Sequence, residues 1–309
     1  MTVRTGLSRR QALLSAAALP LAAALPGRAS AGAEKQGMSV PTFKRFTLGE
    51  FEVTTLLAGT RAVENPHDIF GLNVGAEEFA AASDAAFLPS DVVQFFFTPT
   101  LVNTGGSLIL FDTGLNPEGI TTALAAAGHS PDQIDTVVIT HMHGDHIGGL
   151  MGEGGATFAN ASFVTGATEH NHWMGAGNET FDAKVRPLNE RFSFLDDGGQ
   201  VAPGVTALAA HGHTPGHMAY RIESGGKALI VIADAANHPV WSLARPDWEV
   251  KFDMDKAMAA ATRKSLFGMI AADRLPFIGY HMPFPATGFI EAAGEGFRYV
   301  PTSYQLMLG

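Results

Sequence analysis

Short apolar runs separated by turn residues fill the chain from residue 43 onwards. FKRFTLGEFEVTTLLAG (43–59) alternates apolar and polar positions around Gly49, which predicts a β-hairpin. Residues 61–91 show no regular period and indicate a flap or wall, with one helix at 76–83. Further apolar runs predict strands within 95–105, 106–114, 135–140, 162–166, 205–211, 217–224, 227–234 and 275–281.

Helical patterns lie between several of these strands. NPEGITTALAAAG (116–128) carries Pro117 near its start and Gly128 as a C-terminal stop. A later helix is predicted by apolar residues at helical spacing, namely Met258, Ala261, Leu266, Met269 and Ile270. Strands and helices alternate in both halves, so the predicted class is α/β, and no linker divides residues 43–309.

Polar side chains end four of the predicted strands. LILFDTG delivers Asp112, VVITH delivers His141, LIVIAD delivers Asp234 and FIGYH delivers His281. Sites in α/β sheets form beyond the carboxyl ends of strands. We therefore expect these four side chains to meet at one sheet edge.

A dense cluster, THMHGDHIGG (140–149), begins at the end of the run VVITH. His141 and His143 are two positions apart, so they project to the same side of an extended or turn segment and can hold one metal ion. Asp145 and His146 lie just beyond and can face a second ion. The nearby Gly144, Gly148 and Gly149 would let the backbone turn tightly.

Each ion needs ligands from distant segments. HGHTPGH (211–217) offers His217, whereas His211 and His213 are interpreted as structural or supporting residues. Asp234 can lie between the ions with one oxygen on each. The predicted ligands are His141, His143, His217 and Asp234 for one ion, and Asp145, His146, His281 and Asp234 for the other. Imidazole and carboxylate ligands suit Zn²⁺, with Fe, Mn or Co as alternatives.

Residues 1–31 differ from the rest of the chain. They carry Arg4, Arg9, Arg10 and Arg28 and no acidic residue, followed by an apolar run at 12–26 and small residues at 29–31. This pattern predicts a signal peptide that is cleaved after Ala31. SRRQALL (8–14) resembles a twin-arginine motif, with the Sec route as the alternative. Residues 32–42 are interpreted as an N-terminal tail, and the expected location is periplasmic or secreted.

Charge and composition narrow the partners. The formal net charge is −10, and removal of residues 1–31 would make it −14, which disfavours nucleic acid. No stretch after residue 31 is long and apolar enough to cross a bilayer, so no membrane partner is expected for the mature chain. The chain has no cysteine, so a metal site would use only nitrogen and oxygen ligands.

These motifs together resemble the metallo-β-lactamase superfamily. The resemblance rests on THMHGDH, the preceding FDTG, GHTPGH, the IAD after a strand and the terminal YH, and it covers residues 43–309. It implies an αββα sandwich, two mixed sheets between outer helices, with a dinuclear site at one edge. It also implies that Asp112 orients a ligand histidine.

Within the superfamily the chain is most similar to exported methyl parathion hydrolase-like and lactonase-like enzymes. FTLGEFEVTTLLAGT, LVNTG and GEGFRYVP carry this likeness. By the same likeness, Trp173, Phe192 and Phe194 are expected to line the substrate pocket. Zinc β-lactamases mostly use a cysteine ligand or lack the bridging aspartate, and glyoxalase II uses basic residues near its C-terminus, where this chain has only Arg298.

The sequence thus predicts a dinuclear hydrolase of a small neutral ester: a lactone, an aryl ester or a phosphotriester. A hydroxide that bridges the ions would attack, and Asp145 or Asp234 would move a proton. Alternatives are a β-lactamase, a glyoxalase II-like thioesterase and a non-catalytic metal-binding periplasmic protein. The expected partners are a small-molecule substrate and the Tat or Sec machinery; a homodimer stays open.

Overall fold

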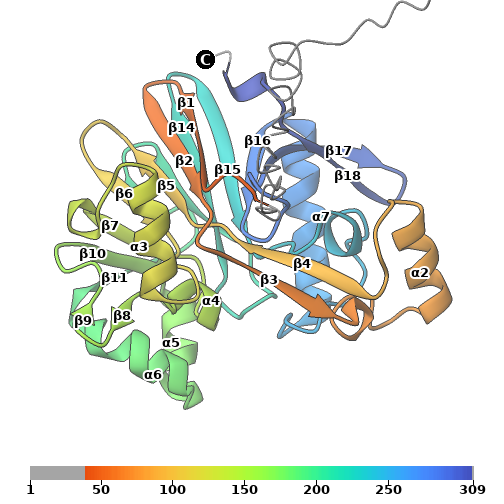
Figure 1. Cartoon of the computed structure of the whole chain (residues 1–309), viewed down its shortest axis with the longest axis horizontal. Helices are drawn as coiled ribbons and strands as arrows, with labels where there is room; N and C mark the ends of the chain where they lie inside the picture. The colour runs from red at the N-terminus through yellow and green to blue at the C-terminus, as the bar shows by residue number, and fades with distance from the viewer. Residues whose placement is uncertain (1–38, 308–309) are drawn as a thin grey trace, which may run out of the picture. The chain divides into compact units, whose positions relative to one another are not determined.

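The computed structural model in Figure 1 describes residues 39–307. Within this range, two seven-stranded mixed sheets face one another. The first has the spatial order β1 (Phe43–Leu48), β2 (Phe51–Leu56), β5 (Thr100–Asn103), β6 (Leu108–Phe111), β7 (Thr136–Ile139), β10 (Ser162–Gly166), β11 (Phe192–Leu195). The second has the order β12 (Gln200–Ala202), β13 (Val205–Ala209), β14 (Met218–Ser224), β15 (Lys227–Ala233), β16 (Pro276–Gly279), β17 (Thr287–Ala293), β18 (Gly296–Pro301).

An apolar core lies between the two sheets. It joins Phe111 and Val138 of the first sheet to Tyr220 and Ile230 of the second. The central strands β7 and β15 read as continuous apolar runs because both of their faces are covered. His141 lies two residues after the end of β7, and Asp234 directly follows β15. His281 lies two residues after the end of β16, so the ends of these three strands position the three side chains.

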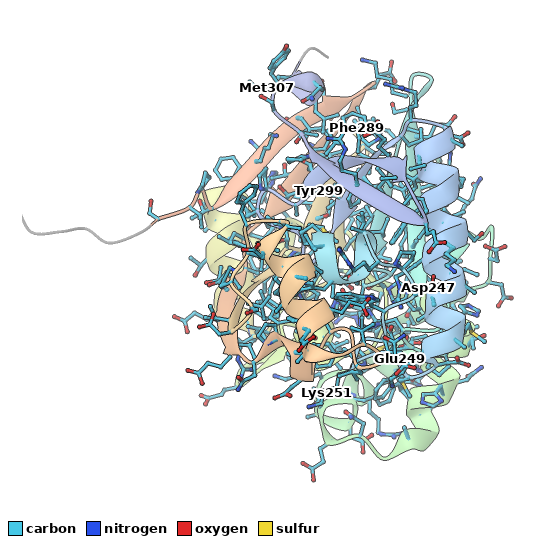
Figure 2. All side chains as sticks on the ribbon, turned by 90° about the vertical axis from the view of Figure 1, so that its right-hand side faces the viewer. Asp247, Glu249, Lys251, Phe289, Tyr299 and Met307 are labelled. Carbon is cyan, nitrogen blue, oxygen red and sulfur yellow. The ribbon has the colours of Figure 1, made fainter. Side chains whose placement is uncertain are left out.

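Helices cover the outer faces of the sheets. The first sheet carries α3 (Pro117–Ala126), α4 (Gly144–Ile147), α5 (Ala167–Ala176) and α6 (Glu179–Lys184), and the second carries α7 (Lys256–Ala272). Ile120 and Leu124 of α3 pack with Leu110 of β6 in a second apolar cluster. Figure 2 shows α7 beside the hairpin of β17 and β18, which bears Phe289 and Tyr299. The predicted αββα sandwich is confirmed.

The segment predicted to be irregular holds more structure than the sequence indicates. β3 (Gly59–Glu64) pairs antiparallel with β4 (Val92–Phe97), and α2 (Ala76–Asp84) lies between them along the chain. Val93, Phe95 and Phe97 of β4 pack against Trp241 in a third apolar cluster. A small hairpin is formed by β8 (Met151–Gly152) and β9 (Gly155–Ala156). The remaining short helices are η1 (Pro66–Asp68), η2 (Pro131–Gln133), η3 (Arg186–Arg191), η4 (Pro239–Leu243) and η5 (Gln305–Met307).

Within the described residues, 40–307 belong to one compact unit. The predicted signal peptide and most of the predicted tail at 32–42 lie outside the described residues. Among residues 39–307, none of the helices has the length and apolarity that crossing a membrane requires.

Candidate metal centre

Four segments at one edge of the sandwich bring histidine and aspartate side chains together. The loop after β7 and the first turn of α4 carry His141, His143, Asp145 and His146. The loop between β13 and β14 carries His213, and Asp234 follows β15 directly. His281 follows β16, so the first sheet supplies four of these side chains and the second supplies three.

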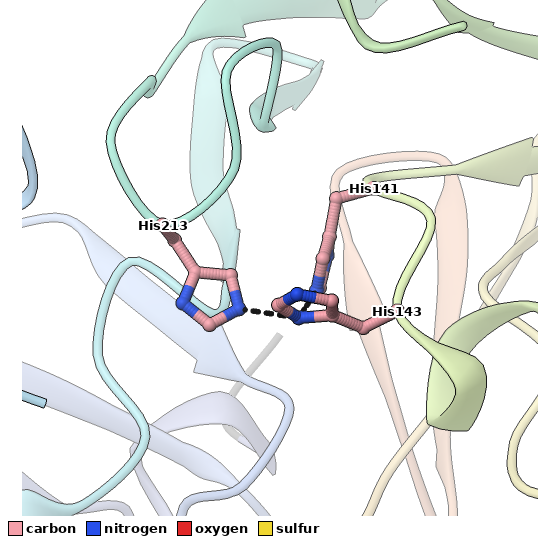
Figure 3. Close-up of side chains that lie close together, drawn as sticks. All are labelled: His141, His143 and His213. Atoms are coloured by element: carbon pink, nitrogen blue, oxygen red, sulfur yellow. Dashed lines mark hydrogen bonds between the residues drawn. The ribbon is translucent and has the colours of Figure 1, made fainter. Parts of the chain in front are cut away.

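The first group consists of His141, His143 and His213. The Nδ1 atom of His143 lies 3.1 Å from Nε2 of His141 and 3.0 Å from Nε2 of His213. Figure 3 shows the three rings directed toward one another from the two loops. Three ring nitrogens that face one another at this distance form a pocket of lone pairs suited to a divalent cation.

The second group consists of Asp145, His146 and His281. The Oδ2 atom of Asp145 lies 3.3 Å from Nε2 of His281 and 3.7 Å from Nε2 of His146. All three come from the segments that the sequence assigns to the second ion. The predicted grouping of these three side chains therefore agrees with the structure.

Asp234 lies between the two groups. Its Oδ2 atom is 3.4 Å from Nε2 of His213 and 3.2 Å from Nε2 of His281, and its Oδ1 atom is 3.3 Å from Nε2 of His146. The side chain is almost fully buried, at 4% exposed. One carboxylate thus reaches both groups, as the sequence predicts for a bridging ligand.

Hydrogen bonds fix which nitrogen each ligand histidine presents. Nδ1 of His146 donates to Asp112 Oδ2 at 2.9 Å, as the family resemblance implies for Asp112. Nδ1 of His213 donates to Asp253 Oδ1 at 3.0 Å, and Nδ1 of His281 donates to the carbonyl of Phe96 at 2.8 Å. Each Nε2 is therefore the nitrogen directed into the cluster, where a metal ion can bind it in place of a proton.

His141 is oriented through a hydroxyl. Its Nδ1 atom donates to Thr140 Oγ1 at 3.1 Å, and that hydroxyl donates to Asp112 Oδ2 at 2.8 Å. Asp112 also accepts from the Thr140 backbone N–H at 2.9 Å. Asp112 adopts a positive φ of 61°, a conformation that costs a non-glycine residue about 1–3 kcal/mol. The strain lies at the residue that orients two ligands.

The structure corrects the assignment of His217. Its Nδ1 atom donates to the carbonyl of Ala210 at 3.0 Å, and its Nε2 atom accepts from the backbone N–H of Asp234 at 3.1 Å. Both ring nitrogens are used, so His217 has no lone pair left for an ion. His213, which the sequence interprets as structural or supporting, occupies the ligand position instead. His217 supports the backbone at Asp234.

The electrostatics of the cluster favour positive charge. Burial would lower the pKa of His281, but Asp234 and Asp145 raise it to about 10. Burial would likewise lower the pKa of His213, but Asp234 and Asp253 raise it to about 9. Burial would raise the pKa of Asp145, but His146 and His281 lower it to about 2. The carboxylates stay ionised and attract cations.

Two orphaned polar atoms test whether these residues fit a metal. Nε2 of His146 and Oδ1 of Asp234 are buried and have no hydrogen-bond partner among the described residues. Leaving such atoms unpaired costs about 1–3 kcal/mol each, more for charged groups. Both atoms face the gap between the two groups, where an ion would satisfy them. The residues present therefore fit divalent metal ions.

Two glycines let the ligand loop approach its neighbours. A Cβ atom at Gly148 would lie 2.1 Å from the carbonyl oxygen of Leu115, and one at Gly149 would lie 2.1 Å from that of Thr113. Neither glycine has a positive φ, so close approach and not turn geometry requires them. Gly144 meets only ordinary contact, with Thr180 Cγ2 at 3.6 Å. The sequence interpretation of these glycines as turn residues is thus corrected.

The predicted pocket aromatics lie in different surroundings. Phe192 is buried in the apolar cluster beneath the first sheet and stacks on Phe163, so it is a core residue and not a pocket wall. Trp173 is also buried there, with its ring centroid 5.9 Å from that of His143. Phe194 is exposed and lies against His170. Pocket roles for Trp173 and Phe194 stay predictions.

Sequence reasoning missed two buried acids that support the centre. Asp253 joins His213 to Arg263, whose Nη1 atom donates to Asp253 Oδ2 at 2.8 Å. Glu169 in the first turn of α5 is fully buried and accepts four hydrogen bonds. The sequence around Glu169 is polar and carries His170 and His172, so it gave no signal that this acid is buried.

A cavity of about 320 Å³ borders the second group at His281. Apolar side chains form most of its wall, with Leu88, Val92, Phe96 and Trp241 among them. Sites for small molecules are typically concave, largely apolar and of this size or larger. The cavity can accept an uncharged apolar group beside the candidate metal centre.

Comparisons with known proteins agree with this arrangement. The family model for the metallo-beta-lactamase superfamily matches residues 98–274. An N-acyl homoserine lactonase of Bacillus cereus is 24% identical over 144 residues, which are 47% of this chain and 55% of the relative. One from Bacillus thuringiensis is 28% identical over 115 residues, 37% of this chain and 43% of the relative. The chain thus matches about half the length of these curated relatives.

Solved structures match over a larger share of the chain. AidC, a dizinc quorum-quenching lactonase in complex with a product, N-hexanoyl-L-homoserine, is 28% identical with a TM-score of 0.77, covering 85% of this chain and 98% of AidC. The hydrolase AbOPH of the beta-lactamase superfamily is 25% identical with a TM-score of 0.80, covering 87% of this chain and 100% of AbOPH.

Proposed function

The chain belongs to the metallo-β-lactamase superfamily, and from this premise we propose that it is a lactonase that works with two divalent metal ions, most readily zinc. The single observation that carries the proposal is the position of Asp234, whose carboxylate lies within 3.4 Å of ligand nitrogens in both groups. A purely structural zinc site is closed and holds one ion. Two groups that share one carboxylate favour a hydrolytic pair of ions.

Each ion has a defined set of ligands in this proposal. His141, His143 and His213 would hold the first ion, and Asp145, His146 and His281 would hold the second, with Asp234 within reach of both groups. When bound, such ions polarise a carbonyl oxygen and make water nucleophilic at neutral pH.

The protein's own groups then orient the reaction. Asp145 has the more open carboxylate, at 23% exposed against 4% for Asp234, so we assign proton transfer to Asp145. It accepts the proton of the attacking water as the new C–O bond forms. The ring C–O bond of the lactone then breaks, and the proton passes to the leaving oxygen, which gives a hydroxy acid.

The substrate class follows from the cavity and the relatives. The cavity beside His281 suits an apolar substituent, and the formal net charge of −10 disfavours anionic substrates. Curated relatives and the AidC structure concern N-acyl homoserine lactones. We therefore propose a neutral lactone that bears an acylamino substituent.

A substrate panel on zinc-reconstituted protein tests the function. N-acyl homoserine lactones, aryl esters, a phosphotriester and a cephalosporin are compared by kcat/KM. We expect the lactones to be hydrolysed fastest, and Asp234→Ala or His146→Ala to lower the rate at least about 100-fold. Protein that binds two ions and hydrolyses none of the lactones would overturn the proposal.

A further inference from the structure

Glu169 is a fully buried carboxylate in the first turn of α5. Oε1 accepts from the backbone N–H of Met142 at 2.9 Å and from Trp173 Nε1 at 2.7 Å. Oε2 accepts from Thr214 Oγ1 at 2.7 Å and from the backbone N–H of Gly216 at 2.9 Å. All four partners are donors, so both carboxylate oxygens act as acceptors.

The donors belong to the two loops that form the first ligand group. Met142 lies between His141 and His143, so its N–H fixes the backbone between two ligands. Thr214 follows His213 directly, and its hydroxyl reaches the other oxygen. One carboxylate therefore connects a loop of the first sheet to a loop of the second.

The loop that carries His213 lies directly on α5. A Cβ atom at Gly216 would come within 2.1 Å of the Glu169 backbone nitrogen, so the two backbones are in close contact. Trp173, one turn further along α5, donates to the same carboxylate and fills the space beside His143. The carboxylate, the glycine and the indole together hold the two loops at a fixed separation.

We propose that Glu169 is a positioning residue that sets the distance between His143 and His213 and so determines the affinity of the first metal ion. It does not touch the ligand atoms; it acts through the backbone on either side of them. This inference rests on the proposed two-ion centre but not on the identity of the substrate.

The effect is selective for one of the two ions. The second group consists of Asp145, His146 and His281, and these are held by other contacts. His146 is held by Asp112 and His281 by the carbonyl of Phe96. Loss of the Glu169 contacts would therefore loosen the first group and leave the second in place.

Glu169→Gln tests the proposal because it keeps the shape and removes the charge. A carboxamide cannot accept from four donors, so the N–H of Gly216 is left unpaired when the amide nitrogen faces it. Zinc-depleted full-length protein is titrated with zinc against a chromophoric chelator. We expect the affinity of one ion to fall about 10- to 100-fold, while that of the other changes less than about threefold. Anomalous zinc density at a limiting zinc concentration should remain at His281 and vanish at His143.

Two further variants complete the experiment. Glu179→Gln, an exposed acid at the start of α6, is the matched control and should bind both ions as the wild type does. Thr214→Val removes a single donor and should weaken the first ion by a smaller factor; it decides the question if Glu169→Gln does not fold. Unchanged affinity of the first ion in both Glu169→Gln and Thr214→Val, or equal weakening of both ions, would overturn the proposal.

The readout is zinc affinity and not turnover. If the wild type binds two ions but hydrolyses no lactone, the proposed function fails while the role of Glu169 can still be measured. If lactones are hydrolysed and Glu169→Gln binds both ions normally, only the role of Glu169 fails.

Discussion

The hydrogen bond on the far side of each imidazole decides which histidines can be metal ligands. His141, His146, His213 and His281 each donate from Nδ1 to a protein oxygen, and each directs Nε2 into the cluster. His217 also donates from Nδ1, but its Nε2 accepts from a backbone N–H. The spacing of the histidines in HGHTPGH does not reveal which Nε2 is occupied. That depends on how the folded loop lies against the backbone of Asp234. The sequence therefore predicted six of the seven converging side chains and chose the wrong histidine of this loop.

His213→Gln and His217→Gln should separate the two roles. We expect His213→Gln to lose one ion per chain and at least about 100-fold in kcat/KM for a lactone, because a ligand is removed. His217→Gln should keep both ions and lose about 1–3 kcal/mol of unfolding free energy, since buried partners are left unpaired. Metal analysis and denaturant unfolding measure these effects. Loss of an ion from His217→Gln alone would contradict the assignment.

At the scale of elements, the periodicity of apolar residues predicted most strands and helices. It did not predict which face of a helix is buried. The predicted hairpin, β7, β10, β13, β14, β15 and β16 are confirmed, as are α2 and α3. β17 and β18 were missed, because their sequences are only weakly apolar, contain glycine and show little alternation of apolar and polar residues. On α7 the predicted apolar face included Met258 and Ala261, which are exposed.

The error on α7 has a physical cause. Arg263 is buried, because its guanidinium donates to Asp253 and to the carbonyls of Pro246 and Trp248. A charged residue is normally placed on the solvent face of a helix, so its burial could not be read from hydropathy. The buried face of α7 therefore includes Ala259, Arg263 and Phe267. Through Asp253, this face supports His213.

Asp253→Asn tests the link from α7 to the metal centre. An amide holds the His213 ring less firmly than an ionised carboxylate, so we expect zinc affinity to fall about 10- to 100-fold. Asp255→Asn is the matched control, because Asp255 caps α7 through the Met258 N–H and asparagine caps helices equally well. Competition titration with zinc compares the two. Equal affinities in both variants would show that the carboxylate at Asp253 is dispensable.

At the scale of the whole molecule, the metal centre joins the two sheets. His141, His143, Asp145 and His146 come from the first sheet, and His213, Asp234 and His281 come from the second. No segment of the sequence contains the site, so it could be predicted only because apolar strands end repeatedly in histidine or aspartate. The cavity could not be predicted from the sequence, because its walls come from separate segments, among them β4, η4 and the loop after β16.

Removal of zinc should destabilise the entire compact unit that begins at residue 40. An ion that binds only the folded state at 100 times its Kd adds about 2.7 kcal/mol of stability. We expect chelator-treated protein to unfold at a clearly lower temperature than the zinc-loaded form in calorimetry. In the Asp234→Ala variant the chelator should have a much smaller effect. Identical unfolding temperatures with and without chelator in the wild type would contradict a centre that joins the sheets.

The strand β4 contributes both to the proposed zinc site and to the cavity, and this constrains which substitutions can change the substrate range. The carbonyl of Phe96 orients His281, while the Phe96 side chain and Val92 form part of the cavity wall. A substitution on this strand that reshapes the wall also shifts the backbone that holds His281. Substitutions on β4 that change the substrate range would therefore also weaken zinc binding, whereas changes at Leu88 or Trp241, which line the cavity from outside β4, would not act on His281 directly. Laboratory evolution for bulkier lactones should therefore accumulate early substitutions away from β4.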